Sequence, residues 1–413
     1  MIRSYLKISI AVLKRRKFLT FVNLFGTVLT LSTLVTGFAV LESMLSPDGA
    51  QRRQAHILVV NHVGLIGENQ ANRSGPGWAF YERYIEPMQS PDKTSFATAG
   101  SPGSSYVDGR EITSVLRRTD AAYWTILDFD LLDGRTLAPD DVDRGRFVAV
   151  INQATAGRFF PGRTALGESI AVNQQSFEVV GVVADEPETS RLAYADIWVP
   201  LTTAESDYRK RWLGDGSVML YVEDPARRRA VQDEYRDALR GFEYPNDPTL
   251  YHTALSSADT ALDSIAATLL GRENGRAPTA RFVAAALLVA LLAMLLPAIN
   301  MANLNVGRIF ERAPEIGLRK ATGASTRTLV GQLVFENVVL VFVGGMLAFA
   351  ITPVLLAFLN RTYFAYGTLG LNLPVFTAGL LFIVLFGVLS GAYPGWRMAR
   401  LEPAAALRGL GHA

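Results

Sequence analysis

Few residues in this chain have types and spacing that could support catalysis or metal binding. Cysteine is absent, which excludes a thiolate nucleophile and a Cys-ligated metal. The four histidines, at positions 56, 62, 252 and 412, do not have the spacing of a zinc site. The pattern G-x-x-x-x-G-K-[ST] does not occur, so the sequence contains no phosphate-binding loop of that kind. We therefore expect no catalytic, metal-binding or cofactor-binding residues in this chain.

Acidic residues gather beside Pro139, where Asp140, Asp141 and Asp143 follow one another closely. Paired carboxylates can perform acid–base chemistry, but a proline next to several short polar residues is typical of a turn. We interpret this stretch as a solvated loop.

The charged segment at residues 308–327, RIFERAPEIGLRKATGASTR, could take part in binding. Glu315 and Arg319 are four residues apart, so a helix would place them as an ion pair. From the residues alone, two interpretations stay open. A basic amphipathic element of this kind can lie on anionic lipid headgroups, or it can dock on a partner protein.

Four long charge-free runs surround this segment and define the architecture. They cover residues 18–41, 282–307, 337–360 and 362–396. About 18 apolar residues in a helix are enough to cross the hydrocarbon core of a bilayer. The first run is longer than the apolar part of a signal peptide and no cleavage site follows it, so we expect a retained anchor. The sequence therefore predicts an α-helical membrane protein with four transmembrane helices and a large α+β extracytoplasmic domain between the first and second helices.

Orientation follows from the basic residues in the short segments. The N-terminal tail, the segment between the second and third runs, and the C-terminal tail are all rich in Lys and Arg, whereas the connector between the last two runs has only Arg361. Both termini are therefore expected in the cytoplasm, with the domain outside. The predicted segments are the tail 1–17, spans 18–43, 280–307, 328–358 and 374–396, the external domain 44–279, the cytoplasmic segment 308–327, the external connector 359–373 and the tail 397–413.

The external domain is expected to mix strands and helices in an α+β architecture with two lobes. Val-rich residues 146–152 and 178–184 predict buried strands, and residues 173–176 predict a hairpin turn. Asp224 and Pro225 predict a helix start. Pro-Gly-Ser-rich residues 101–105 and residues 186–190 are expected to be loops.

Small residues in the apolar runs are suited to close helix packing. Four spans are too few to enclose a substrate path comfortably, so we expect a dimer. Its interface is predicted on the first span, at Gly26, Thr30, Thr33 and Gly37. Gly344 and Gly345, in the third run, are expected to allow close contact between helices rather than to bind nucleotide.

Residues 311–324 have the pattern E-R-x-x-E-I-G-x-R-K-A-x-G-A, which resembles the cytoplasmic signature of the MacB-like and FtsX-like permeases of type VII ABC transporters. Residues 393–407 are similar to the end of these permeases, and residues 123–183 are similar to their periplasmic core. Pro314 departs from the pattern of these permeases, and it disfavours a helical conformation at Ala313.

The resemblance implies that the segment between the second and third spans is a coupling helix that docks on a separate ATPase subunit, which binds ATP and Mg²⁺. The implied contact residues are Glu311, Arg312, Glu315, Ile316, Gly317, Arg319, Lys320 and Gly323. The chain would then be a non-enzymatic permease subunit that transmits ATPase motion to a periplasmic domain for export or extraction of substrates. The alternative is an FtsX-like regulator of a periplasmic enzyme.

Further partners and the location also follow from the resemblance. A second permease copy or a paralogue is expected, and a membrane-fusion protein and an outer-membrane channel are compatible with it. The location would be the bacterial inner membrane, with both termini cytoplasmic. A net charge of +2 gives no reason to expect nucleic acid as a partner.

Overall fold

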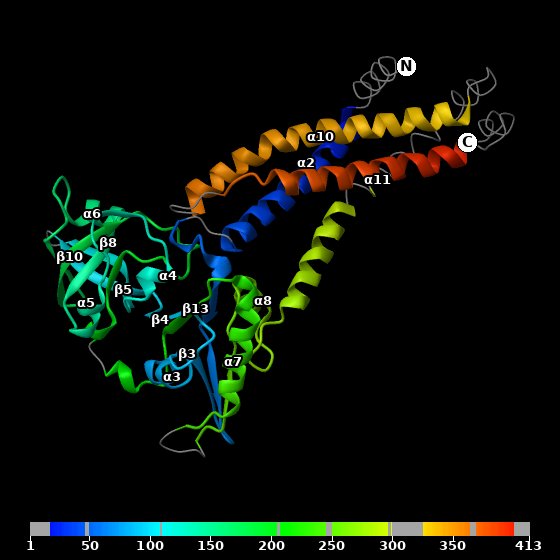
Figure 1. Cartoon of the computed structure of the whole chain (residues 1–413). Helices are drawn as coiled ribbons and strands as arrows, with labels where there is room; N and C mark the ends of the chain where they lie inside the picture. Colours follow the sequence, from blue (N-terminus) through cyan, green and yellow to red (C-terminus); the bar gives the residue numbers. More distant parts are fainter. Residues whose placement is uncertain are drawn as a thin grey trace. The chain divides into compact units, whose positions relative to one another are not determined.

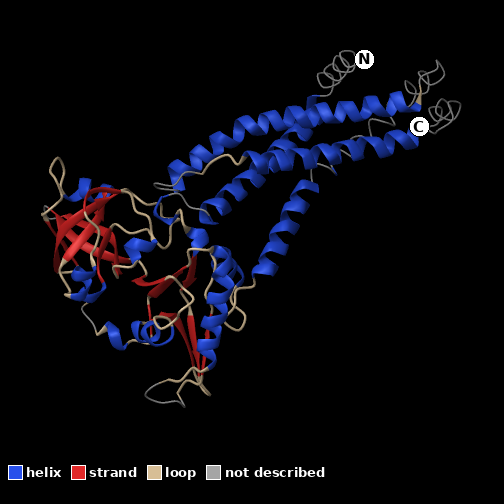
Figure 2. Ribbon diagram, viewed as in Figure 1, coloured by secondary structure: helices blue, strands red, loops and turns tan. Residues whose placement is uncertain are grey.

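The computed structural model describes residues 17–45, 49–107, 110–204, 207–244, 250–295, 299, 325–363 and 369–399. The chain divides into two compact units. One is a helical unit, residues 1–41, 283–361 and 369–413; the other is an external unit, residues 42–282 and 362–368. Figures 1 and 2 show long helices in the first unit and mixed strands and helices in the second.

The helical unit is built on α2 (Lys17–Leu45), α10 (Thr326–Tyr363) and α11 (Leu373–Ala399). Their apolar side chains meet in one cluster, to which each helix contributes, with Leu31, Leu340 and Phe376 as examples. By length and composition, two of the described helices can cross a membrane, Thr20–Leu45 and Val330–Thr362. The apolar stretches Thr279–Leu295 and Leu373–Leu389 are shorter among the described residues, so the four-span topology stays a prediction.

Helix boundaries differ at the connector that was predicted between the last two spans. α10 continues to Tyr363, beyond the predicted boundary at residue 358, and α11 begins at Leu373. The extra turn is held partly by Asn360, whose amide nitrogen donates to the Leu369 carbonyl at 3.2 Å and whose Oδ1 accepts from the Leu369 N–H at 2.8 Å. The side chain of Asn360 thus closes the described ends of the connector.

Close contact between helices in this unit depends on small and polar residues. A Cβ on Gly344 would lie 2.9 Å from Thr27 Cγ2, and one on Gly345 would lie 2.5 Å from Leu380 Cδ1. These contacts confirm the packing role predicted for the glycine pair. The Thr352 hydroxyl bonds to the Ser32 hydroxyl at 3.0 Å, which joins α10 to α2.

The external unit contains six described α-helices, apart from the helix Thr279–Leu295 that leaves it. They are α3 (Trp78–Tyr84), α4 (Tyr123–Ile126), α5 (Pro139–Asp143), α6 (Gln153–Phe159), α7 (Arg228–Arg240) and α8 (Ala261–Leu270). Asp224 accepts a hydrogen bond from the Ala226 N–H at 2.9 Å, so the predicted helix start is confirmed, with a short 3₁₀ turn before α7. Figure 1 shows α7 and α8 among the strands of this unit.

A ten-stranded sheet forms the centre of the unit, with main order β1-β13-β4-β6-β11-β8-β10-β7. β5 pairs with β6, and β9 pairs with β10. The strands are β1 (Ile57–Val60), β4 (Lys93–Thr98), β5 (Ser101–Val107), β6 (Arg110–Thr119), β7 (Leu131–Gly134), β8 (Val148–Asn152), β9 (Ser169–Val172), β10 (Gln175–Val183), β11 (Ile197–Pro200) and β13 (Gly216–Tyr221).

A second, four-stranded sheet has the order β12-β3-β2-β14. Its strands are β2 (Val63–Ile66), β3 (Ala71–Pro76), β12 (Leu213–Gly214) and β14 (Thr253–Ser256). Buried side chains fall into three clusters along the unit. Consecutive residues of β8 belong to different clusters, Val150 to one and Ile151 to another. Both faces of the large sheet are therefore covered there, which explains why β8 has an unbroken apolar sequence. A division into two lobes stays a prediction.

The hairpin predicted at residues 173–176 is confirmed. β9 and β10 pair antiparallel, and Asn173 and Gln174 have φ values of 50° and 66°, as a tight two-residue hairpin turn requires. The loop predicted at residues 101–105 is wrong, because these residues are strand β5, paired along its length with β6. Serine and glycine are tolerated there because β5 is bonded to only one neighbour in the large sheet.

The solvated loop predicted at the acidic stretch is also wrong. Residues Pro139–Asp143 form α5, and Asp141 is buried. Its Oδ2 accepts from Arg135 at 2.5 Å and from the Ala138 N–H at 2.9 Å. Burial acts to raise the pKa of the Asp141 carboxyl, but the hydrogen bonds from Arg135 and Ala138 and the charge of Arg146 outweigh it, so the pKa lies below its ordinary value.

Candidate functional site

The predicted coupling residues, all between positions 311 and 323, lie outside the described residues. Their role as a docking surface therefore stays a prediction. The predicted dimer face on α2 is described. Gly26 and Thr30 are half-buried, while Thr33 and Gly37 are exposed. A Cβ on Gly37 would meet nothing within 4 Å, so the outer part of this face is open in the single chain.

Two segments of the external unit lie next to long apolar helices along the chain. We call residues 49–54, which follow α2 after three residues that are not described, the N-terminal junction. We call residues 257–281, which lead into the helix Thr279–Leu295, the C-terminal junction.

Glu186 is the centre of the N-terminal junction. Its side chain comes from the loop after β10 and is 2% exposed, and Oε1 accepts from the Ala50 N–H at 2.9 Å. Its other oxygen, Oε2, is buried without a hydrogen-bond partner among the described residues. Gly49 has a φ of 79°, and a Cβ there would lie 2.7 Å from Oε2. Only glycine fits this position without strain or a shift of the carboxyl group.

Two further residues tie this junction to the same part of the unit. Gln51 is buried, and its Oε1 accepts from the Leu192 N–H at 2.9 Å and the Ala193 N–H at 3.2 Å. Arg52 forms exposed ion pairs with Asp128 at 3.4 Å and Asp130 at 2.8 Å. The backbone just after the first membrane helix is therefore bonded to two loops that are far away in the sequence.

Electrostatics make Glu186 unusual among the carboxyl groups of the unit. Burial raises its pKa to about 7, helped by the negative charge of Asp130. The Ala50 N–H and the charge of Arg52 act in the opposite direction. Arg52 is itself bonded to Asp128 and Asp130, so Glu186 has no ion-pair partner of its own among the described residues. This carboxyl group can change its protonation near neutral pH.

The C-terminal junction contains a buried acid, Asp259, that is paired with a cation. Asp259 is 3% exposed and forms an ion pair with Arg272 at 2.5 Å. The Ser257 hydroxyl donates to the other carboxylate oxygen at 2.6 Å. Burial raises the pKa of the Asp259 carboxyl, and the bonds from Arg272 and Ser257 oppose that shift. Arg272 also donates to Asn61 at 3.3 Å, which connects the junction to the end of β1.

The start of the next helix is tied to α8. The Thr260 hydroxyl caps α8 by accepting from the Asp263 N–H at 3.2 Å, and Asp263 Oδ2 accepts from the Thr260 N–H at 3.0 Å. The other oxygen of Asp263 accepts from the hydroxyl of Thr279, the first residue of the helix Thr279–Leu295. Arg281 adds an exposed ion pair with Glu273.

Both junctions meet at β1. The Val59 N–H donates to the Asp259 carbonyl, and the Asp259 N–H donates to the Val59 carbonyl, each at 2.8 Å. β1 begins three residues after the N-terminal junction ends, and Asp259 lies within the C-terminal junction. One strand of the large sheet thus receives both connections.

Comparison with known proteins now adds to this geometry. The family described as "MacB-like periplasmic core domain" matches residues 20–238, more than half of the chain. The chain belongs to this family. The family described as "FtsX-like permease C-terminal" matches residues 287–403. The chain is therefore a MacB/FtsX-like ABC transporter permease with a periplasmic domain, and both matched parts are permease parts.

Relatives of this permease are distant. The macrolide export ATP-binding/permease protein MacB of Azoarcus sp. (strain BH72) is 27% identical over 93% of this chain and 57% of its own length. The uncharacterized ABC transporter permease YknZ of Bacillus subtilis (strain 168) is 24% identical over 72% of this chain and 70% of its own length. The crystal structure of the periplasmic region of MacB from Actinobacillus actinomycetemcomitans covers 44% of this chain and 83% of its own, with 17% identity and a TM-score of 0.34. The permease thus spans about three-fifths of the MacB relative.

Sequence reasoning missed both junctions of the permease. A signal was present at Gly49, because the preceding Pro47 and Asp48 make a Pro-Asp-Gly turn pattern. Glu186 gave no signal because Ala50 lies 136 residues away, and no spacing rule connects Arg272 with Asp259, 13 residues before it.

Proposed function

We propose that this chain is the permease subunit of an ATP-driven export system, in which a separate ATPase binds ATP and Mg²⁺ and moves the permease helices. The observation that carries the proposal is that one chain matches both a MacB-like periplasmic core and an FtsX-like permease end. The relatives' names support export, since MacB is named for macrolide export and PvdT of Pseudomonas syringae for pyoverdine export.

In this proposal the coupling segment, residues 308–327, is pushed by the ATPase, and the first two spans carry the motion outward. The bonding of both junctions to the large sheet supports this route, because a loosely tethered domain would not follow the helices. The working unit is a dimer of permeases, identical or paralogous, that packs through Gly26, Thr30, Thr33 and Gly37. The exposed outer half of that face supports the assignment.

The proposed location is the bacterial inner membrane, with four spans and both termini cytoplasmic. The absence of cysteine makes this topology direct to test, since each single-cysteine variant has one thiol to label. A cysteine at Lys320 should react with a membrane-impermeant maleimide only after the membrane is opened, whereas one at Glu188 should react in spheroplasts. Labelling of both from outside would overturn the orientation.

The coupling assignment has its own test. We expect Glu315→Ala together with Arg319→Ala to lower transport per ATP hydrolysed by at least about tenfold, because a few central residues carry most of the energy of an interface. Membrane insertion should not change. The matched control is Arg361→Ala, at the opposite end of α10, which should leave transport intact. Unaltered transport in the double variant would refute the docking role.

The same preparation distinguishes the second candidate, an FtsX-like regulator of a periplasmic enzyme. An exporter should show faster ATP hydrolysis when its small-molecule substrates are added. Stimulation only by a cell-wall hydrolase would favour the regulator. A purified complex that contains no ATPase would exclude both.

A further inference from the structure

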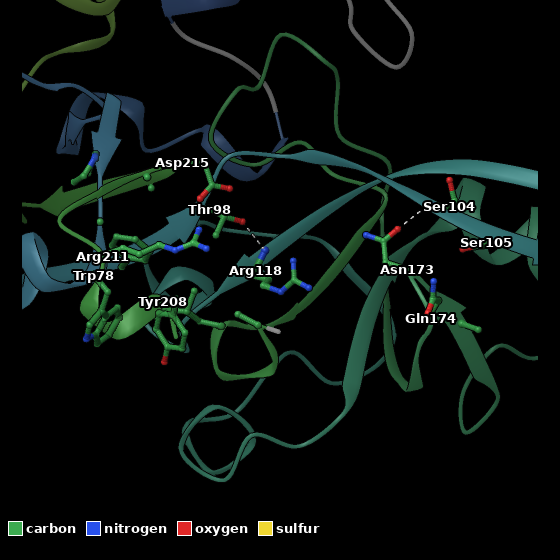
Figure 3. Close-up of a pocket in the computed structure, with 18 of the residues that line it drawn as sticks. Trp78, Thr98, Ser104, Ser105, Arg118, Asn173, Gln174, Tyr208, Arg211 and Asp215 are labelled. Carbon is green, nitrogen blue, oxygen red and sulfur yellow. Dashed lines mark hydrogen bonds between the residues drawn. The ribbon is translucent and has the colours of Figure 1, made fainter. Parts of the chain in front are cut away.

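A cleft in the external unit combines cationic and aromatic side chains in a way that the proposed transport role does not use. It has a volume of about 830 Å³, within the range of about 300–1,000 Å³ that is usual for small-molecule sites. One wall comes from the segment around α3 and from residues 208–216, and the other from β5, β6 and the turn between β9 and β10. Figure 3 shows this cleft.

The two arginines of the cleft are positioned by the fold. The Arg118 guanidinium donates to Gln175 Oε1 at 3.3 Å, and Gln175 is held by a bond from its amide nitrogen to the Thr203 carbonyl at 3.0 Å. The Arg118 N–H donates to Thr98 at 3.0 Å, as drawn in Figure 3. The Arg211 carbonyl accepts from the Ala79 N–H at 3.0 Å, which fixes the backbone of Arg211 against the start of α3.

Charge and polarity in the cleft favour an anion. Among the described residues that line it, Arg118 and Arg211 are the cations and Asp215 is the one carboxylate. Figure 3 shows the guanidinium groups of both arginines in the middle part of the site. Asn173 lies on the other wall, where its Oδ1 accepts from the Ser104 N–H at 2.9 Å, and its amide nitrogen points toward the centre of the cleft. Arginine suits the planar oxygens of carboxylates, sulfonates and phosphates.

Packed aromatic side chains form one end of the cleft. The Trp78 ring is half-buried and packs edge-on against Phe96 and Tyr208, with centroids at 5.4 Å and 5.7 Å. These contacts fix the indole while part of its surface stays accessible at the cleft. A flat apolar group could pack there with little loss of side-chain freedom, because the rings are already ordered.

We propose that this cleft binds a small amphipathic anion, with its acidic group between Arg118 and Arg211 and its apolar part against Trp78 and Tyr208. The role goes beyond the export function and does not depend on it. The external unit would hold such a molecule whether or not ATP is present.

The test uses the complete chain in lipid nanodiscs, without ATP or an ATPase, and isothermal titration calorimetry. The probe is naphthalene-2-sulfonate, compared with the neutral naphthalene-2-sulfonamide and with methanesulfonate, which lacks the rings. Both comparison compounds should bind at least about tenfold more weakly than the probe, because each lacks one of the two recognised parts. Empty nanodiscs measure partitioning of the probe into lipid.

Three variants locate the site. Arg118→Gln and Arg211→Gln should each weaken sulfonate binding by about tenfold or more, and Arg229→Gln, an exposed arginine on α7 away from the cleft, should not change it. Asp215→Asn should strengthen binding, because the one negative charge of the lining is removed. An increase in affinity cannot come from misfolding, so this variant keeps the test decisive.

Equal binding of the sulfonamide, unchanged binding in both arginine variants, or weaker binding in Asp215→Asn would each overturn the proposal. None of these results would affect the export proposal, because no nucleotide hydrolysis is measured. Loss of coupling in the Glu315 and Arg319 variant would likewise leave this site untouched.

Discussion

The two junctions connect the same external unit to membrane-anchored helices, but they solve the problem of a buried acid in opposite ways. In the C-terminal junction, Asp259 is paired with Arg272 at 2.5 Å. In the N-terminal junction, Glu186 has a backbone N–H as its hydrogen-bond donor, and its pKa rises to about 7. A buried carboxyl group without a cation is stable when it is protonated, whereas a buried ion pair is stable only while both charges remain.

This difference suggests distinct mechanical properties. In the C-terminal junction, Asp259 keeps Arg272 and Ser257 as partners when it is ionised, although burial raises its pKa too. The N-terminal junction should weaken as Glu186 ionises, so the hold on the backbone after the first span becomes sensitive to the acidity of the external compartment. Four experiments can test this contrast, each with the complete chain in nanodiscs.

The largest effect is expected from Arg272→Met. Removing this cation leaves Asp259 buried and charged, which typically costs about 3–5 kcal/mol. Urea unfolding followed by tryptophan fluorescence measures the change. The control is Arg281→Met, which breaks an exposed ion pair with Glu273 and should cost no more than about 1 kcal/mol. If both variants lose the same free energy of unfolding, burial of the Asp259 ion pair does not change its contribution to stability.

Glu186→Gln comes next and tests the pH sensitivity. The folded chain raises the pKa of this carboxyl from 4.5 to about 7, so it binds a proton more tightly than the unfolded chain does. Its stabilising contribution is therefore complete below pH 4.5 and is lost as the pH rises through about 7.

The wild type should lose about 3 kcal/mol of unfolding free energy from this group between roughly pH 5 and pH 8, and Glu186→Gln should not show that loss. The matched control is Glu188→Gln, an exposed acid in the same loop, which should keep the wild-type pH profile. A wild-type profile that is flat in this range would refute the contrast between the junctions.

Gly49→Ala is expected to have a smaller effect, and a second glycine allows its cause to be separated. Gly162 has nearly the same conformation, with a φ of 73°, but a Cβ there would meet nothing within 4 Å. Gly162→Ala therefore measures the backbone strain alone, about 1 kcal/mol. Gly49→Ala should cost roughly 1–2 kcal/mol more because its Cβ also displaces the Glu186 carboxyl group. If both cost the same, the close contact with Glu186 has no energetic importance.

Thr279→Val should have the smallest effect, about 1 kcal/mol, because it removes one hydroxyl bond to Asp263 at the start of the outgoing helix. Hydrogen exchange at the first turns of the helix Thr279–Leu295 should become faster. Thr268→Val, which loses an exposed bond to the Ser264 carbonyl within α8, should not speed exchange there. No difference between the variants would remove Thr279 from the junction.

Local patterns in the sequence predicted the local structure well. The hairpin at Asn173 and Gln174, the cap at Asp224 and the apolar strand β8 each depend on neighbouring residues, and the structure confirms them. The permease family was also predictable, because residues 311–324 carry a compact signature. The structure does not describe those residues, so the predicted docking surface has not gained or lost support from it.

Long-range pairing was not predictable. β5 looked like a loop because its Ser and Gly residues disfavour strands, but seven residues of β6, Arg110 to Leu116, pair with it. Asp141 looked solvated because the residues beside Pro139 have a turn pattern, but Arg135 and the Ala138 N–H compensate for its burial. In the junctions, Glu186 is 136 residues away from Ala50. A single sequence contains no information on which of many polar residues will meet at such distances.

The paired hydrogen bonds between Val59 and Asp259 have a practical consequence for protein engineering. They bring the first and last parts of the external unit next to each other. Domains whose ends lie close together can be inserted into other proteins. Residues 42–282 could thus be grafted into a surface turn of an unrelated soluble host through short glycine linkers. Such a chimaera would present the anion cleft in water, free of lipid, for crystallisation and ligand screening.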